Sequence, residues 1–111
     1  MAFLEPILGS ANAERVLVYL LARGEGYARE IARFSGADPD SIQKQLAKLE
    51  AGGVLASRQA GRTVLYQFSP RYPFLPELKG LLEKAIGFYP EEERERLMMA
   101  RQRPRRRGKP L

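Results

Sequence analysis

The segment DPDSIQKQLAKLEAGG, residues 38–53, decides the fold, because it has the pattern of a helix with a defined start and end. Asp38 is of a type that commonly caps a helix N-terminus, and Pro39 suits the first helical position. The paired glycines that close the segment are typical of a helix end. We therefore predict a helix over residues 38–51 and ask what its outward side faces.

One side of this predicted helix is apolar and the opposite side is polar. Ile42, Leu46 and Leu49 recur at helical spacing and are expected to face the core. At about 100° per residue, the outward side then carries Asp40, Lys44, Ala47 and Lys48, with Ser41 and Gln43 at its flanks. Taken alone, this is the pattern of any amphipathic helix with a solvated face, so the neighbouring elements decide its meaning.

Two further helical patterns precede this segment. The first covers residues 12–23, and its apolar positions at helical spacing are Val16, Leu17, Leu20 and Leu21. The second covers residues 27–34 and is followed by a turn at Gly36, a residue type that tolerates positive φ. Two helices joined by a short glycine-containing turn make a helix-turn-helix.

A β-hairpin is predicted directly after the segment, over residues 54–69. Two runs rich in β-forming residues flank Ala60-Gly61, which is a turn signal. Residues 74–88 predict another helix, whose apolar face consists of Leu75, Leu78, Leu81, Leu82 and Ile86. The chain is thus expected to be mainly α with a small β-hairpin, in the order α-α-α-β-β-α.

The composition excludes several classes of function. The chain has no cysteine and no histidine, so it lacks thiolate ligands, the commonest metal ligand and the commonest general base. No catalytic constellation stands out, and we predict neither an enzyme nor a bound metal or cofactor. No apolar run approaches the roughly 18 residues of a membrane span, and the N-terminus lacks the pattern of a signal peptide. We therefore expect a cytoplasmic protein without a membrane partner.

The net charge of +6 is confined to one end of the chain. Residues 1–100 contain 13 Lys and Arg against 13 Asp and Glu, whereas residues 101–111 contain six basic residues and no acid. Residues 91–102 show a helical pattern with glutamates first and arginines last, as the helix dipole favours. The following RPRRRGKPL is predicted to be disordered. This basic tail either contacts nucleic acid or only keeps the chain in solution.

The ordered combination resembles the winged helix-turn-helix transcriptional regulators, in particular the ArsR-like and MarR-like groups of bacteria and archaea. The residues that carry the resemblance are YAREIARFSGADPDSIQKQLAKLEAGGVLASRQAGRTVLYQFSP, 27–70. Within them, LAKLEAGGVL joins the predicted recognition helix to the predicted wing. The resemblance covers about residues 12–70 and implies sequence-specific binding of double-stranded DNA by a transcriptional regulator.

The resemblance implies that residues 38–51 are a recognition helix for the major groove. Gln43 can pair with adenine through two atoms, and Lys44 can donate to guanine or to phosphate. Ser41 is a candidate for either a base or the backbone. Lys48 lies farther along the helix and is expected to meet phosphate.

The resemblance further implies that residues 54–69 form a wing at the adjacent minor groove. Arg62, beside the turn, resembles the arginine that such proteins place in or near that groove, whose negative potential attracts it. Arg58 and Thr63, also near the tip, complete the candidates for DNA binding. The alternative is that an arginine here only keeps the hairpin soluble. Asp40 departs from the family pattern with a carboxylate that repels phosphate.

In the resembling families the first and last helices pair across a two-fold axis, which implies a homodimer. The leucine-rich helix 74–88 and the apolar start MAFLEPIL fit this role, although the helix could equally pack on its own domain. We divide the chain into residues 1–90, a winged helix-turn-helix domain with its dimerisation helix, and residues 91–111, a charged helical extension with the basic tail.

A second hypothesis belongs to another class of function. Winged helices also serve as protein-interaction modules, and a resembling domain of this short kind can be the partner of a nucleotidyltransferase. ArsR-like metal sensing through cysteine is excluded because the chain has none. No feature of the sequence identifies a small-molecule effector.

Overall fold

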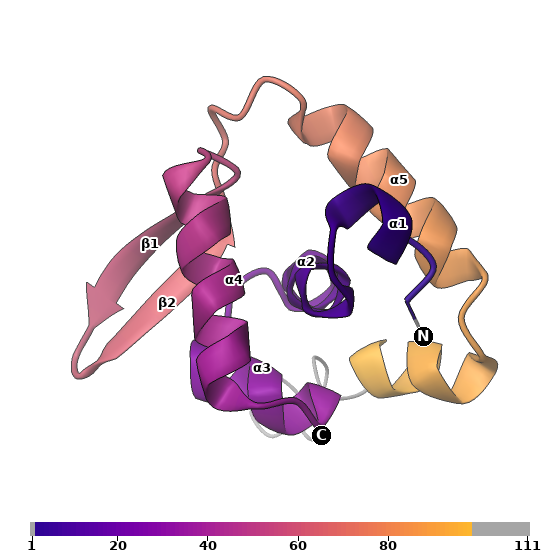
Figure 1. Ribbon diagram of the computed structural model, residues 1–111, viewed down its shortest axis with the longest axis horizontal. Helices are drawn as coiled ribbons and strands as arrows, with labels where there is room; N and C mark the ends of the chain where they lie inside the picture. The colour runs from indigo at the N-terminus through magenta and orange to yellow at the C-terminus, as the bar shows by residue number, and fades with distance from the viewer. Residues whose placement is uncertain (1, 99–111) are drawn as a thin grey trace, which may run out of the picture.

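The computed structural model describes residues 2–98 (Figure 1). The elements are α1 (Glu5–Leu8), α2 (Ala11–Arg23), α3 (Ala28–Ser35), α4 (Pro39–Ala51), β1 (Leu55–Ala60), β2 (Thr63–Phe68) and α5 (Leu75–Gly87). Residues 91–98 form a further helix. The predicted winged helix-turn-helix fold, mainly α with one β-hairpin, is confirmed. The short helix α1 is an addition to the predicted order.

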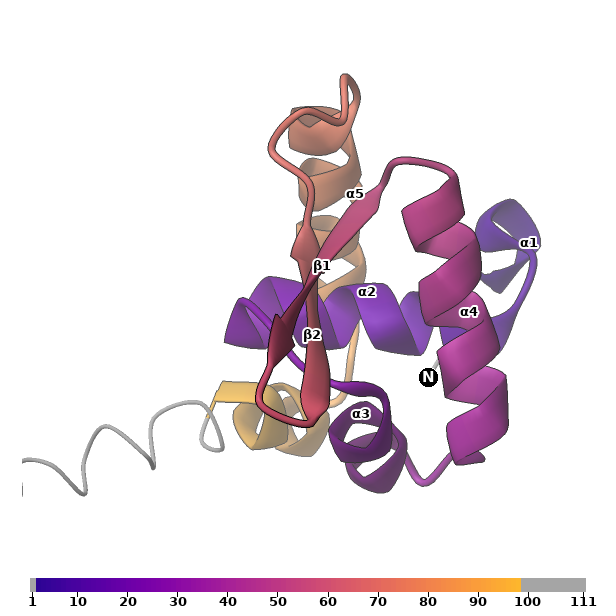
Figure 2. The same cartoon turned by 90° about the vertical axis from the view of Figure 1, so that its left-hand side faces the viewer.

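Helix α2 lies at the centre of the fold, and the other elements surround it (Figures 1 and 2). It contacts α1, α3, α4, α5 and β2. Ser10 caps it by accepting a hydrogen bond from the backbone N–H of Ala13 at 3.0 Å. Its middle is buried on every side, at Val16, Leu17, Val18, Tyr19 and Leu20. A helix that is apolar all round forms a core rather than a surface.

Helices α3 and α4 form the helix-turn-helix. α3 ends at Gly36, whose φ of 68° is the left-handed conformation that glycine adopts without strain. Asp38 then caps α4, because its carboxylate accepts a hydrogen bond from the backbone N–H of Ser41 at 3.0 Å. Ile42 and Leu46 are fully buried, as predicted for the apolar stripe of this helix. Their burial turns the polar side of α4 outward.

Strands β1 and β2 form the antiparallel hairpin and pair along their whole length. The loop between them is Gly61-Arg62, one residue later than expected. Gly61 has a φ of 65° and Arg62 does not have a positive φ. A positive φ at the first loop residue alone is the pattern of a type II′ turn, whose twist matches that of paired strands.

A third segment pairs with the hairpin. Gly26, in the loop between α2 and α3, exchanges two backbone hydrogen bonds of 2.8 and 3.1 Å with Tyr66 of β2. A Cβ atom on Gly26 would lie 2.7 Å from the Cε1 atom of Tyr19, which is buried in the core. Glycine is therefore required where this loop passes between α2 and the wing.

Helix α5 packs on α2 through a narrower face than the sequence predicts. Leu82 and Ala85 are buried, whereas Leu81, which was expected to face inward, is 37% exposed. Near the end of α5, the Tyr89 hydroxyl donates a hydrogen bond of 2.7 Å to Glu14 of α2, which also accepts from the backbone N–H of Leu4 at 2.7 Å. Burial, and after it this hydrogen bond, raises the pKa of Tyr89. The fully buried Glu14 carboxylate thus joins both ends of the domain to α2.

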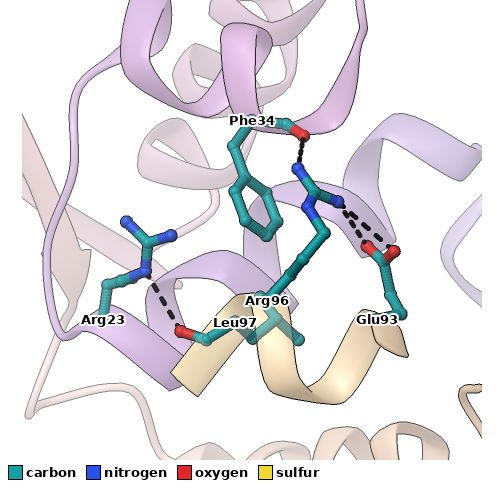
Figure 3. A network of polar contacts seen from close by, with 5 residues as sticks. All are labelled: Arg23, Phe34, Glu93, Arg96 and Leu97. Carbon is teal, nitrogen blue, oxygen red and sulfur yellow. Dashed lines mark hydrogen bonds and ion pairs between the residues drawn. The ribbon is translucent and has the colours of Figure 1, made fainter. Parts of the chain in front are cut away.

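The helix of residues 91–98 packs back on α2 and α3 (Figure 3). The Arg96 guanidinium donates to the carbonyl oxygen of Phe34 at 2.7 Å, and Arg23 donates to the carbonyl oxygen of Leu97 at 3.3 Å. The Phe34 ring lies between the two guanidinium groups, 4.0 Å from that of Arg96 and 4.9 Å from that of Arg23. These cation–π contacts hold the end of α3, just before the turn that leads to α4.

The predicted basic tail, residues 101–111, lies outside the described residues. The division of the chain at residue 90 stays a prediction. Within residues 2–98, no helix is long and apolar enough to cross a membrane.

Candidate nucleic-acid interface

The outward face of α4 lies beside the hairpin along one edge of the molecule (Figures 1 and 2). Gln43, Lys44 and Lys48 are exposed on this face. Neither lysine forms an ion pair with any other described residue. We call the outward face of α4 together with the hairpin the α4–wing surface; its predicted site residues are Ser41, Gln43, Lys44, Lys48, Arg58, Arg62 and Thr63.

Gln43 is exposed, but rotation of its side chain would break a hydrogen bond. Its Nε2 amide donates a hydrogen bond of 3.1 Å to the hydroxyl oxygen of Tyr66. The Tyr66 ring is buried, with 6% of the residue exposed. This bond connects α4 directly to β2 of the hairpin.

Ser41 takes part in the cap of α4. Its backbone N–H and its hydroxyl both donate to the same carboxylate oxygen of Asp38, at 3.0 and 3.2 Å. A serine hydroxyl has one proton and two lone pairs. Because the proton is engaged by Asp38, the hydroxyl of Ser41 is left to accept hydrogen bonds rather than to donate them.

Arg58, in the middle of β1, forms an ion pair with a residue outside the hairpin. Its guanidinium lies 2.8 Å from the carboxylate of Glu25, in the loop between α2 and α3. Both side chains remain about half exposed, at 56% and 43%. Solvent weakens such a pair, so Arg58 can exchange Glu25 for another anion.

Arg62 occupies the tip of the wing and is exposed, whereas the neighbouring Thr63 is half-buried where the strand begins. A different bond steadies the base of the wing: the hydroxyl of Ser57 on β1 donates to the Glu50 carboxylate of α4 at 2.6 Å. Both strands are therefore attached to α4: Ser57 of β1 bonds to Glu50 of α4, and Tyr66 of β2 bonds to Gln43 of α4.

The charges of the α4–wing surface nearly cancel. Its four cations are Lys44, Lys48, Arg58 and Arg62, and the carboxylates that lie on or beside it are Asp38, Asp40, Glu50 and Glu25. Counterion release from DNA grows with the number of phosphates that a protein neutralises. A single copy of this surface therefore offers little electrostatic attraction for a polyanion.

Among residues 2–98, no group of three or more acidic side chains is arranged to hold a metal ion. A hollow of about 200 Å³ lies between α2, the end of α3 and residues 89–97. Its charged side chains, Arg15, Glu93 and Arg96, each make a hydrogen bond within the chain. No cofactor is assigned to it.

Two residues that contact this surface are absent from the predicted set. Glu25 and Tyr66 contact predicted site residues from positions 33 and 23 residues away in the sequence. The signal for Tyr66 is present in the sequence, because a tyrosine on the inward face of a strand needs a partner for its hydroxyl. No local pattern identifies Glu25 as the partner of Arg58.

Several solved structures share this fold. The antimony-specific transcriptional repressor AntR matches with a TM-score of 0.57 and 22% identity, over 76% of this chain and 74% of its own. A mutant of ZitR from Lactococcus lactis, in its apo form, matches with a TM-score of 0.54 and 20% identity, over 87% and 82%. The third is the homodimeric winged helix-turn-helix DNA-binding domain of Mb0332 from Mycobacterium bovis, described as a possible ArsR-family transcriptional regulator. It matches with a TM-score of 0.52 and 25% identity, over 74% and 75%.

No protein-family model matches this chain, and no curated protein does. These three likenesses extend over 74–87% of this chain. The expected resemblance to winged helix-turn-helix transcriptional regulators is thereby confirmed, and the chain has the fold that these proteins share.

Proposed function

We propose that this chain is a homodimeric transcriptional regulator that binds double-stranded DNA in a sequence-specific manner. In this proposal α4 enters the major groove and the hairpin lies at the adjacent minor groove. The observation that carries it is the exposure of Gln43, Lys44 and Lys48 together on the outward face of α4, beside the wing. The major groove of B-DNA admits one α-helix, and residues near the helix N-terminus contact base edges.

The proposed roles on α4 follow from the position of each residue along the helix. Gln43 and Lys44 lie in its N-terminal half and read bases, adenine by the amide and guanine by the ammonium group. Ser41 accepts a hydrogen bond from a base or lies against the backbone. Lys48 lies one turn beyond Lys44 and binds phosphate.

The proposed roles in the wing depend on exposure and charge. Arg62 at the exposed tip enters the minor groove, whose negative potential attracts a guanidinium. Arg58 leaves Glu25 for a phosphate, at the small cost of an exposed ion pair. Thr63 supports the tip and donates its hydroxyl to the backbone.

The proposed dimer doubles the DNA contacts that one α4–wing surface makes, and exposed apolar side chains are its candidate interface. Phe3, Ile7 and Phe88 are 46%, 69% and 68% exposed, and the rings of Phe3 and Phe88 lie 6.2 Å apart. Such large exposed apolar side chains at the two ends of a domain suit burial against a second copy. Two-fold symmetry would place the second α4 about 34 Å from the first, on a palindromic site. The proposed place of action is the cytoplasm.

Selection of bound duplexes from a random DNA pool, using the full chain, tests this proposal. A palindrome with half-sites about one helical turn apart is expected. Fluorescence anisotropy on the selected duplex then gives the salt dependence. A dimer in which Lys48 and Arg58 of each subunit neutralise about four phosphates gives a slope of log K against log salt near −4.

A chain that ends at residue 98 is the matched control, because it keeps the described fold and removes the six basic residues of the tail. If all binding disappears with the tail and no sequence is enriched, the proposal is wrong. A protein-interaction module, such as a nucleotidyltransferase partner, would then be the better account.

A further inference from the structure

We infer that Tyr66 is a positioning residue for base recognition: its hydroxyl holds the Gln43 amide in the orientation that reads adenine. This inference rests on the proposed function and adds to it the identity of one base and the residue that sets the preference. It starts from the hydrogen bond of 3.1 Å between Gln43 Nε2 and Tyr66 Oη, which joins α4 to β2.

The first step is the count of hydrogen-bonding groups on Gln43. A glutamine amide has two N–H donors and one carbonyl acceptor. Tyr66 takes one donor, so one N–H and the carbonyl oxygen remain on an exposed side chain. Adenine presents one acceptor, N7, and one donor, N6–H, in the major groove. The groups left on Gln43 are therefore the pair that adenine requires.

The second step is the rigidity of the support. The backbone of Tyr66 pairs with Ser57 on one side and with Gly26 on the other, and the residue is only 6% exposed. The loop at Gly26 passes so close to Tyr19 that a Cβ atom there would lie 2.7 Å from the ring. Tyr66 thus has little freedom to move, and its hydroxyl is a fixed anchor.

The third step is the effect of anchoring on recognition. A long, exposed glutamine loses rotamer freedom when it docks on a base. An anchor that orders the side chain before DNA arrives removes part of that loss, and it favours one base because only one orientation of the amide is supplied. Tyr66 therefore contributes to discrimination between bases without touching DNA itself.

The test compares Tyr66→Phe and Gln43→Ala in the full chain. A set of duplexes carries every single base-pair change in the site that the unmodified chain selects, and anisotropy gives the affinity for each. Gln43→Ala is expected to abolish a preference for A·T at one position of each half-site, a loss of roughly 5- to 150-fold. Tyr66→Phe is expected to weaken that same preference roughly two- to tenfold and to leave the other positions unchanged.

Two further comparisons exclude a merely structural effect. In the double variant Tyr66→Phe should add nothing to Gln43→Ala, because the anchor then has nothing to hold. Tyr72→Phe removes the same atom from the loop before α5 and serves as the matched control. Without DNA, nuclear magnetic relaxation of the Gln43 side-chain amide should report an ordered group in the unmodified chain and in Tyr72→Phe, and a mobile one in Tyr66→Phe.

The outcomes separate this inference from the proposal on which it rests. If the unmodified chain selects no sequence, the proposed function is overturned, and the inference with it. If a sequence is selected but Tyr66→Phe binds every duplex as the unmodified chain does, or weakens all of them equally, only the inference is overturned. An additive double variant, or a Gln43 amide equally mobile with and without the hydroxyl, overturns it as well.

Discussion

Removing the carboxylate of Glu25 is expected to strengthen DNA binding, because Glu25 holds an arginine that DNA would otherwise attract. The Arg58 guanidinium lies 2.8 Å from the Glu25 carboxylate, with side-chain exposures of 56% and 43%. An exposed pair of this kind contributes at most about 1 kcal/mol, which is given up when Arg58 turns to a phosphate. In Glu25→Gln this cost is absent, so the affinity is expected to rise, by at most about fivefold for each subunit bound.

Anisotropy titrations at several salt concentrations measure this effect. Arg58→Ala removes one phosphate contact per subunit and should make the slope of log K against log salt shallower by about 0.9 per subunit. The control is Glu83→Gln, which removes the same charge from α5, across the molecule from the wing (Figure 1). Glu25→Gln must bind more tightly than Glu83→Gln. This difference must disappear when both variants also carry Arg58→Ala. Equal affinities for the two glutamine variants would refute the reasoning.

Four other substitutions test the fold and the dimer. Leu46→Ala removes a fully buried side chain of α4 and should lower the free energy of unfolding by about 2–5 kcal/mol in urea titrations; a loss below 1 kcal/mol would contradict the packing described. Gly26→Ala places a Cβ atom 2.7 Å from Tyr19 Cε1 and should cost about 1–3 kcal/mol in the same assay, so an unchanged midpoint would show that the loop lies elsewhere. Phe88→Glu and Ile7→Glu change side chains that are 68% and 69% exposed, so they should leave the thermal midpoint nearly unchanged but convert a dimer to a monomer in light scattering; unaltered dimers would place the interface on another surface.

The sequence predicts α4 well because local signals agree there. The cap at Asp38, the proline after it and the buried positions Ile42 and Leu46 all lie within one segment and specify one helix with one inward face. The hairpin is predicted for the same reason, although its loop falls one residue later than expected. Patterns of this kind indicate which face of an element is buried. They do not indicate how wide that face is, since Leu81 and Leu82 were both predicted to face inward and only Leu82 is buried.

The contacts that shape the candidate site are not local, and periodicity does not encode them. Tyr66 meets Gln43, and Glu25 meets Arg58, only because the folded chain brings the wing back to the helix-turn-helix. The docking of residues 91–98 is missed for a similar reason. Its contacts include cation–π stacking and hydrogen bonds to backbone carbonyls (Figure 3), and a run of charged residues in the sequence does not indicate such partners.

The central claim is that α4 lies in the DNA groove, and site-directed crosslinking tests it most directly. The chain has no cysteine, so a single Cys at Ala47, which is exposed on the outward face of α4, accepts a photoreactive label without competing sites. A label on Glu83→Cys in α5 is the control. We predict that Ala47→Cys crosslinks to bases inside each half-site of the selected duplex and that Glu83→Cys does not. Crosslinks from the α5 position, with none from α4, would contradict the account.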